Sequence, residues 1–521
     1  MLAVRELRER HGREVALAAL CAVLFLTFLD NTIVSVALAD IQESLSVSVS
    51  GLQWIVDGYM LAFAALMLTG GTLGDLIGRK KVMLAGVAVF CAGSIVAALA
   101  TSTSILIAGR LVMGVGAAAS EPGTLSLIRH IYPEREERAV ALGVWAAVSG
   151  LALALGPVIG GVLVGGVGWR SIFWFGLGFG AVALAVAAVS LTESSDPVGR
   201  RLDIPGLTVG ASAITAATFG VIEGENRGYG TWWIGLLFGV AAVLVVVFVL
   251  VEQRVPDPVL KIEFLRNRTF AAANVVAFAT NLSVFSIFFF TALYLQLISN
   301  FSGFQIALTF VPLAAAMIVA GPIAGRWTAR FGPRVPMVLG CVLAGAGLLL
   351  VDWKLTATTT VAALTWPLAI AGLGFGMALV TMTAAVLTLV PPEQSGMAAS
   401  TVNTSRELGG VFGVAVLGAV VNAQLTTGLA DKLAKLGIPA DFRQLVINFV
   451  TTGGNLSTAE SNPAARGHLG LVAKVLAAAE DAAGHGVHLA LEIAAAIVLA
   501  AAVVAVFAGR RPGPRAGEVE I

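Results

Sequence analysis

Long apolar runs follow one another along nearly the whole of this 521-residue chain, and they limit its fold more than any other feature. Charged or Gly/Pro-rich turns separate about fourteen such runs, each with about the 20 residues that a helix needs to cross a bilayer. A water-soluble core cannot absorb this much apolar surface, since 58% of the residues are hydrophobic and only 12% are charged. The sequence therefore predicts an all-α, polytopic membrane protein.

The expected spans cover residues 16–39, 51–73, 82–100, 105–128, 139–162, 172–192, 205–223, 233–251, 271–297, 304–325, 335–352, 361–390, 397–422 and 487–508. The first run follows four arginines, as a signal peptide would, but it contains Asp30 and has no convincing cleavage site. We therefore expect it to be a permanent span.

Basic residues predict the orientation of the spans. The turns on the side of the N-terminus hold 22 Lys and Arg residues and the opposite side holds eight, five of them in one long loop. Such an excess marks the cytoplasmic side of a membrane protein. Both termini are therefore expected in the cytoplasm, in the cytoplasmic (inner) membrane of a bacterium.

A repeated turn indicates internal duplication. The turn after the second span reads Gly71-x-Leu73-Gly74-Asp75-x-x-Gly78-Arg79-Lys80-Lys81, and residues 325–334 repeat its glycine spacing and basic character. We expect an N-terminal six-helix half (1–192), two additional helices with linkers (193–270), and a C-terminal six-helix half (271–521) with a long extracellular loop (423–486). Parallel repeats are typical of transporters that bind substrate between their halves.

Motifs in several spans accompany this turn. The fifth span carries Gly150-x5-Gly156-Pro157-x-x-Gly160-Gly161; the first reads Leu29-Asp30-Asn31-Thr32, the fourth Arg110-Leu111-Val112-Met113-Gly114, and the thirteenth Asn403-Thr404-Ser405-Arg406-Glu407-Leu408-Gly409-Gly410. Over nearly the whole chain these residues resemble the fourteen-spanner drug:proton antiporters of the major facilitator superfamily. The resemblance implies two six-helix halves plus two helices, and export of drugs such as quaternary ammonium compounds in exchange for protons.

Five residues are gating candidates. Asp75 at a helix end can pair with Arg79 or with a neighbouring helix N-terminus, which would latch one side of the protein. Pro157 removes a backbone hydrogen bond and Gly156 permits close packing, so the fifth span can bend. Arg406 is assigned to gating with them. The alternative for the basic residues of the turn, above all its two lysines, is that they only obey the positive-inside rule.

Ionisable residues within the outer half of the membrane are candidates for coupling, because a buried charge is expensive and is retained for a function. Asp30 lies deepest and has Arg110 within plausible reach, so we assign both to proton coupling. Asp57 lies nearer the outer surface, and the resemblance implies that an acid there meets cationic substrates. The alternatives are a permanent Asp30–Arg110 ion pair that holds two helices in register, and a solvated Asp57.

The remaining substrate-binding candidates are polar residues in apolar spans: Glu121, Asn281, Asn403 and Glu407. Glu121 and Glu407 depart from the family pattern, where an apolar residue and Gln are common at these positions. Because neighbours on a helix point about 100° apart, Glu407 is not assumed to be neutralised by Arg406. The alternative for Glu121 is solvation near the cytoplasmic end of its span.

Composition also bounds the partners. A net charge of +1 gives no sign of nucleic-acid binding. The three cysteines form no CxxC pair, so no metal site is predicted, and no cofactor is expected. The expected partners are a small-molecule substrate, protons and the lipid bilayer, with a monomer as the working unit.

The alternatives to a multidrug exporter are a dedicated exporter of an endogenous metabolite, an antibiotic, a metal complex or a lipid, and a membrane-embedded enzyme or sensor. The lack of HExxH and GxSxG motifs weighs against an enzyme.

Overall fold

The computed structural model describes residues 2–508 apart from 46, 48, 196–202, 257, 259, 300, 302, 392–393, 436–437, 439–442 and 444–468. These described residues form helices and no strand. The elements are α1 (Leu2–Ile33), η1 (Val34–Ala37), α2 (Leu38–Leu45), α3 (Val49–Ile77), α4 (Arg79–Ala98), α5 (Thr103–Ile131), α6 (Arg135–Val167), α7 (Arg170–Ser190), α8 (Ile204–Arg227), α9 (Trp232–Glu252), α10 (Ile262–Arg266), α11 (Arg268–Leu297), α12 (Gly303–Phe331), α13 (Arg334–Lys354), α14 (Val361–Leu389), α15 (Ser395–Lys435) and α18 (Leu469–Ala505).

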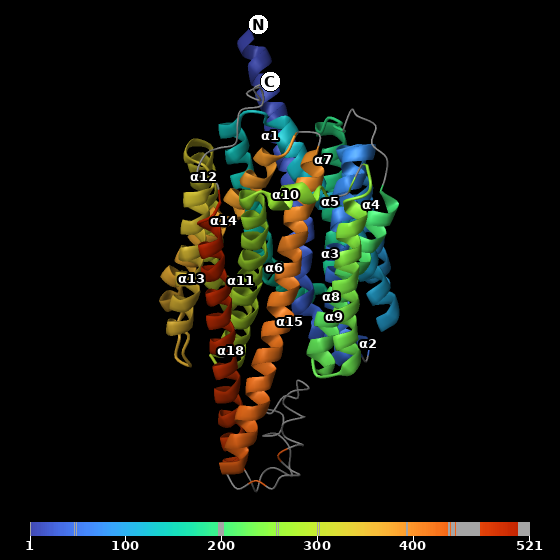
Figure 1. Ribbon diagram of the computed structural model, residues 1–521. Coiled ribbons are helices and arrows are strands. Elements are labelled where there is room, and N and C mark those ends of the chain that lie inside the picture. Colours follow the sequence, from blue (N-terminus) through green and yellow to red (C-terminus); the bar gives the residue numbers. More distant parts are fainter. Residues whose placement is uncertain are drawn as a thin grey trace.

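The long helices stand side by side in one bundle (Figure 1). We call the end at which α1 begins and α18 ends the upper end, as drawn, and the opposite end the lower end. In the described part of the chain, 13 helices are long and apolar enough to cross a membrane, or up to 14 if the bent α6 is one span. The prediction of an all-α polytopic protein with about fourteen spans is confirmed.

The same pattern of neighbours occurs twice along the chain. Among α1–α7, which we call the first helix set, α5 packs on α3 and α4, and α1 packs on α6 and α7. In the second helix set, α11–α18, α14 packs on α12 and α13, and α11 packs on α15 and α18. The sets meet where α6 packs on α12 and α3 on α15. The boundaries at residues 192 and 270 stay a prediction.

The two additional helices lie to one side of this arrangement. α8 and α9 pack on each other, and α8 also contacts α3 and α15. Only 11% of the apolar window of α9 is buried in the protein, against 89% for α14. Because apolar side chains outside the protein face lipid in a bilayer, α9 forms part of the lipid-facing wall and α14 part of the core.

The antiporter-like motif bends α6. Its straight parts, Glu136–Leu153 and Val158–Val167, meet at 41°. A proline at 157 cannot donate the helical hydrogen bond, which weakens the helix at the bend. At Gly156 an added Cβ would lie 1.9 Å from Oγ1 of Thr32, so only glycine allows α1 to approach this closely. The bend expected from the sequence is therefore present, where α6 meets α1.

The expected outer loop at 423–486 needs a correction at both ends. Residues 423–435 continue α15 and residues 469–486 belong to α18, while 438 and 443 are the only described residues between 436 and 468. The two extensions hold together by a small apolar core of their own, which includes Leu429, Leu433 and Ala482, and by a Lys432–Asp481 ion pair. The predicted spans end too early, because both helices continue beyond the apolar segments that hydropathy identifies.

Candidate functional site

Asp30 and Arg110 form a buried ion pair between α1 and α5. Asp30 Oδ2 accepts from Nη1 of Arg110, and both side chains are almost fully enclosed. Arg110 Nε also donates to the carbonyl of Ile55 at 2.8 Å. Its guanidinium lies 4.6 Å from the ring centroid of Tyr59, within cation–π range. The charge of this pair is therefore balanced, and three helices hold it in place.

A second charged cluster lies where the two helix sets meet. Arg406 of α15 forms an ion pair with Glu121 of α5, with 3.6 Å between Nη1 and Oε1. The same nitrogen donates to Oδ1 of Asn403 at 2.9 Å. Glu407 follows Arg406 on α15 and is also buried. The structure therefore brings together four of the predicted site residues, from two helices far apart in sequence.

Aromatic side chains enclose the guanidinium of Arg406. Its carbon lies 5.2 Å from the ring centroid of Phe28 and 5.3 Å from that of Trp145. Trp145 is fixed in turn, since its indole N–H donates to Oγ1 of Thr124 at 3.0 Å. The two rings exclude water from the guanidinium of Arg406. A charged group is costly to bury when water does not solvate it.

Asn281 of α11 contacts this cluster through the backbone. Its Nδ2 donates to the carbonyl oxygen of Arg406 at 2.8 Å. The hydroxyl of Ser405, the residue before Arg406 on α15, donates to Oδ1 of Asn274 at 2.9 Å. These two bonds fix the register of α15 against α11, so Asn281 positions the segment that carries Arg406.

Asp57 belongs to a different cluster, between α3 and the additional helix α8. Its carboxylate lies within electrostatic reach of Glu223. Glu223 accepts from Trp54 Nε1 at 3.0 Å and from Arg227 Nε at 2.7 Å. The side chain of Asp57 is half-buried. The structure therefore places Asp57 near an acid of α8 rather than in the Arg406 cluster.

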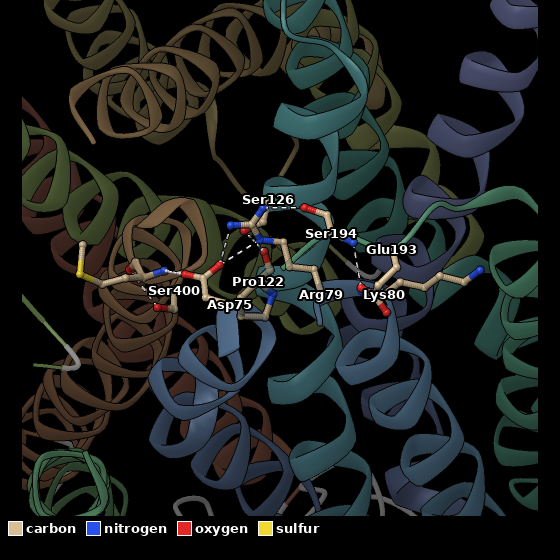
Figure 2. Close-up of polar contacts among 9 residues, drawn as sticks. Asp75, Arg79, Lys80, Pro122, Ser126, Glu193, Ser194 and Ser400 are labelled. Atoms are coloured by element: carbon tan, nitrogen blue, oxygen red, sulfur yellow. Dashed lines mark hydrogen bonds and ion pairs between the residues drawn. The ribbon is translucent and has the colours of Figure 1, made fainter. Parts of the chain in front are cut away.

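At the upper end, Asp75 links the two helix sets (Figure 2). One carboxylate oxygen accepts from Arg79, with 2.9 Å to Nε. The other accepts from the backbone N–H of Met397 at 2.9 Å, in the first turn of α15. The N-terminal end of a helix favours negative charge, so both partners of Asp75 stabilise its ionised form.

The residues after α7 brace this link from the opposite side. Arg79 donates to the hydroxyl of Ser194 at 2.8 Å (Figure 2). The Glu193 carboxylate accepts from the backbone N–H groups of Lys80 and Lys81 at 3.0 and 3.2 Å, which caps the start of α4. Gly78 has φ of +127°, and an added Cβ there would lie 2.8 Å from this carboxylate. Glycine is therefore required at this turn for both conformation and space.

A further contact joins the helix sets at the same end. Arg129, close to the end of α5, donates to the carbonyl of Val390 after α14 at 2.8 Å. Nearer the middle of the bundle, Gly143 of α6 lies against Gly321 and Pro322 of α12 so closely that a Cβ would clash. Several described contacts thus hold the two sets together at and near the upper end.

Sequence inspection missed several residues of these clusters. Glu193, Ser194 and Glu223 lie outside the motifs, and their partners come from distant helices. Tyr59 and Trp145 follow an apolar pattern that identifies them only as core residues. Within the described residues, no three His, Cys, Asp or Glu side chains gather as metal ligands would.

Comparison with sequence families gives one broad match. The profile of the Major Facilitator Superfamily matches residues 20–414. The multidrug resistance protein Stp of Mycobacterium tuberculosis is 34% identical over 79% of this chain and 76% of its own. The methylenomycin A resistance protein of Streptomyces coelicolor is 36% identical over 78% of this chain and 86% of its own. The tetracenomycin C resistance and export protein of Streptomyces glaucescens is 30% identical over 96% of this chain and 93% of its own.

Solved structures share the fold at low identity. A bacterial homologue of the human lysosomal transporter Spinster, inward-facing and unoccupied, has a TM-score of 0.58 at 19% identity and covers 95% of this chain and 97% of its own. The proton:xylose symporter XylE has a TM-score of 0.57 at 11% identity, with 78% and 88% of the two chains covered. These similarities concern the fold alone.

Proposed function

The chain belongs to the Major Facilitator Superfamily, and from this premise we propose that it is a proton-coupled antiporter that exports small amphipathic compounds. Family membership indicates a multi-pass membrane transporter of small molecules rather than an enzyme. Three of its relatives carry names of drug or antibiotic resistance and belong to bacteria, which supports drug export across a bacterial cytoplasmic membrane. The working unit is proposed to be a monomer.

The observation that carries this proposal is the Arg406 cluster. It places Glu121 of one helix set against Arg406 of the other, in the core of the protein. A rocking transporter holds its substrate between two such sets, near the middle of the membrane. Asn281, Asn403 and Glu407 join Glu121 as the proposed substrate-binding residues, and Asp57 would receive cations nearer the lower end.

We assign proton coupling to the Asp30–Arg110 pair. Protonation of Asp30 would remove the charge that holds Arg110, and a group that binds either a proton or a partner links the two equilibria. A pH gradient supplies about 1.4 kcal/mol per pH unit, and one charge moving through 100 mV supplies about 2.3 kcal/mol. Both are adequate to drive export.

The upper end is proposed to be cytoplasmic, with both termini on that side. The excess of basic residues in its turns supports this orientation. On that side Asp75 and Arg79 act as gating residues, and Arg406 and the bend at Gly156 and Pro157 act with them from deeper in the bundle. The bond from Met397 to Asp75 supports a latch that closes the cytoplasmic side while the outer side is open.

A dedicated exporter of one antibiotic is the second candidate. It is favoured by the relative named for tetracenomycin C, which aligns with 96% of this chain. The two candidates differ in breadth of substrate, not in mechanism.

A screen in proteoliposomes under an imposed pH gradient tests the function. Purified protein should accumulate one or more amphipathic compounds against their gradient, and a protonophore should abolish the accumulation. A broad set of accepted compounds would identify a multidrug exporter and a single one a dedicated exporter. Accumulation that persists after the gradient is collapsed would rule out proton coupling.

A further inference from the structure

The turn before α13 repeats the backbone of the turn before α4. Gly78 and Gly332 both have positive φ, of +127° and +87°. Each also donates its N–H to the carbonyl four residues earlier, of Gly74 and Thr328, at 3.1 and 3.0 Å. Both turns lie at the upper end of the bundle (Figure 1). The chain therefore enters α4 and α13 in the same way.

The helix starts that follow these turns differ in their caps. At α4 the carboxylate of Glu193 accepts from the N–H groups of Lys80 and Lys81. The corresponding residues of α13 are Arg334 and Val335. Among the residues that the structure describes, no side chain accepts from the N–H groups of these two. The N–H groups of a helix start favour an anion, so α13 offers the place that a carboxylate fills at α4.

The charges around the second turn are not balanced. Three arginines lie within a stretch of nine residues: Arg326, Arg330 and Arg334. No Asp or Glu occurs from residue 264 to residue 351, and Ala329 stands where the first turn has Asp75. Within the described residues no carboxylate pairs with these arginines, and Glu137 of the adjacent α6 pairs with α1 instead. Like charges one helical turn apart repel each other, so a counter-ion would stabilise the two arginines of α12.

Exposed apolar side chains lead along α12 to this turn. They recur every four residues, with exposed fractions between 41% and 61%: Val319, Ile323, Trp327 and Phe331. In a bilayer such a face contacts lipid chains, and a tryptophan near a helix end lies at the level of the headgroups. The guanidinium of Arg330 lies 5.4 Å from the ring centroid of Phe331. A basic surface and a lipid-facing surface therefore adjoin at this turn.

We propose that the turn between α12 and α13 binds the headgroup of an anionic phospholipid. The phosphate accepts from the N–H groups at the start of α13 and pairs with the arginines, while an acyl chain lies along the apolar face of α12. An anionic lipid fits better than a zwitterionic one, because the ammonium group of the latter would meet three guanidiniums. Basic residues at the headgroup level of membrane helices are typical of sites for anionic lipids.

Lipid binding to purified protein tests the site. Protein stripped of lipid in detergent is titrated with phosphatidylglycerol and with phosphatidylcholine that carry the same dioleoyl chains. Native mass spectrometry counts the bound lipids, and thermal unfolding measures their effect on stability. We expect phosphatidylglycerol to bind at least about tenfold more tightly and to raise the unfolding temperature, as a ligand of the folded state does. Glycerol phosphate, which lacks the chains, should neither bind nor compete.

Substitution of the arginines locates the binding. Glutamine at all three positions (Arg326→Gln, Arg330→Gln and Arg334→Gln) should lower the affinity for phosphatidylglycerol to that for phosphatidylcholine. Arg330→Gln alone should lower it roughly fivefold, the share that one basic residue contributes near an anionic surface. This single variant keeps the test valid if the triple variant folds poorly. Lysine at the three positions keeps the charge and should retain most of the preference.

A second basic segment at the same end supplies a matched control. Arg254, Arg266 and Arg268 are exposed, but the helix start beside them is already capped, since Asn267 accepts from two N–H groups of α11. Arg254→Gln, Arg266→Gln and Arg268→Gln together remove the same charge. They should leave the preference for phosphatidylglycerol unchanged.

Four results would overturn the lipid site. They are equal affinity of the wild type for the two lipids, a preference that survives in the glutamine triple variant, an equal loss in the control triple variant, and displacement of the lipid by glycerol phosphate. The last result would identify a site for soluble phosphate esters, and the third would reduce the effect to net charge at this end of the bundle.

Discussion

The charged residues of the core differ in how far sequence could predict their partners. Asp30 and Arg110 were expected to meet because helix geometry gives them similar depths, and the structure pairs them. The ion pair of Glu121 and Arg406 was not predicted, since it depends on how two helix sets dock. Periodicity within one helix carries no such information.

Replacement of Asp30 tests its role in coupling against a purely structural one. Asp30→Asn should abolish proton-driven uptake and lower stability, because a buried Arg110 without its partner costs about 3–5 kcal/mol. The double variant Asp30→Asn, Arg110→Leu should regain much of the stability but not the uptake. Thermal unfolding and pH-gradient-driven uptake measure the two effects. Uptake restored in the double variant would reduce the pair to a helix-packing contact.

Asp57 is expected to select substrates by charge. Asp57→Asn should weaken transport of cationic compounds about tenfold more than that of neutral ones, since a charged contact contributes about 1.5–3 kcal/mol. Fluorescent substrates matched in size but differing in charge allow the comparison. Arg227→Gln, which changes a charge in the same cluster, is the control. It should not lower transport of cationic compounds relative to that of neutral ones. Equal losses for both classes would remove Asp57 from recognition.

At the scale of helices, the contacts that the sequence predicted best lie at helix ends. The turn at 71–81 was expected to place Asp75 near Arg79 or a helix N-terminus, and it contacts both. The expected bend of α6 is also present. The extensions of α15 and α18 were missed, because small residues such as Ala478 and Ala482 build their core without a strong hydropathy signal.

Loss of the Asp75 carboxylate should affect turnover more than binding. Asp75→Asn keeps the shape but weakens the bonds to Arg79 and Met397, so the latch should open more readily, with transport falling about tenfold and substrate affinity changing little. Lys81→Ala in the same turn is the control, as its side chain is exposed. Uptake rates in proteoliposomes and equilibrium binding provide the comparison. Parallel loss of binding and transport would place Asp75 in the substrate site instead.

At the scale of the molecule, hydropathy predicted the number of spans, and the repeated turn anticipated two sets of helices with the same neighbours. How the sets dock, and where α8 and α9 attach, depends on small residues such as Gly143 and Gly321, whose partners lie in other helices. Glycine is common in membrane helices, so its sequence position does not identify a contact.

Cysteine labelling tests the orientation of the bundle in the membrane. Lys81→Cys and a cysteine at the lower end, Thr231→Cys, should respond oppositely to an impermeant maleimide in intact cells. We expect labelling at 231 from outside, beside the exposed turn between α8 and α9, and labelling at the exposed position 81 only after the membrane is opened. The reverse pattern would invert the proposed topology.

The ion pair between α5 and α15 also bears on how the protein enters the membrane. A lone arginine in the middle of a span raises the insertion free energy by about 2.5–3.5 kcal/mol, and α15 carries Arg406 beside Glu407. Glu121, which offsets this charge, lies on a helix made much earlier during synthesis. The last spans are therefore expected to insert efficiently only when the first ones are already in the bilayer. Residues 271–521, synthesised alone, should insert α15 poorly, and co-expression of residues 1–270 should restore its insertion.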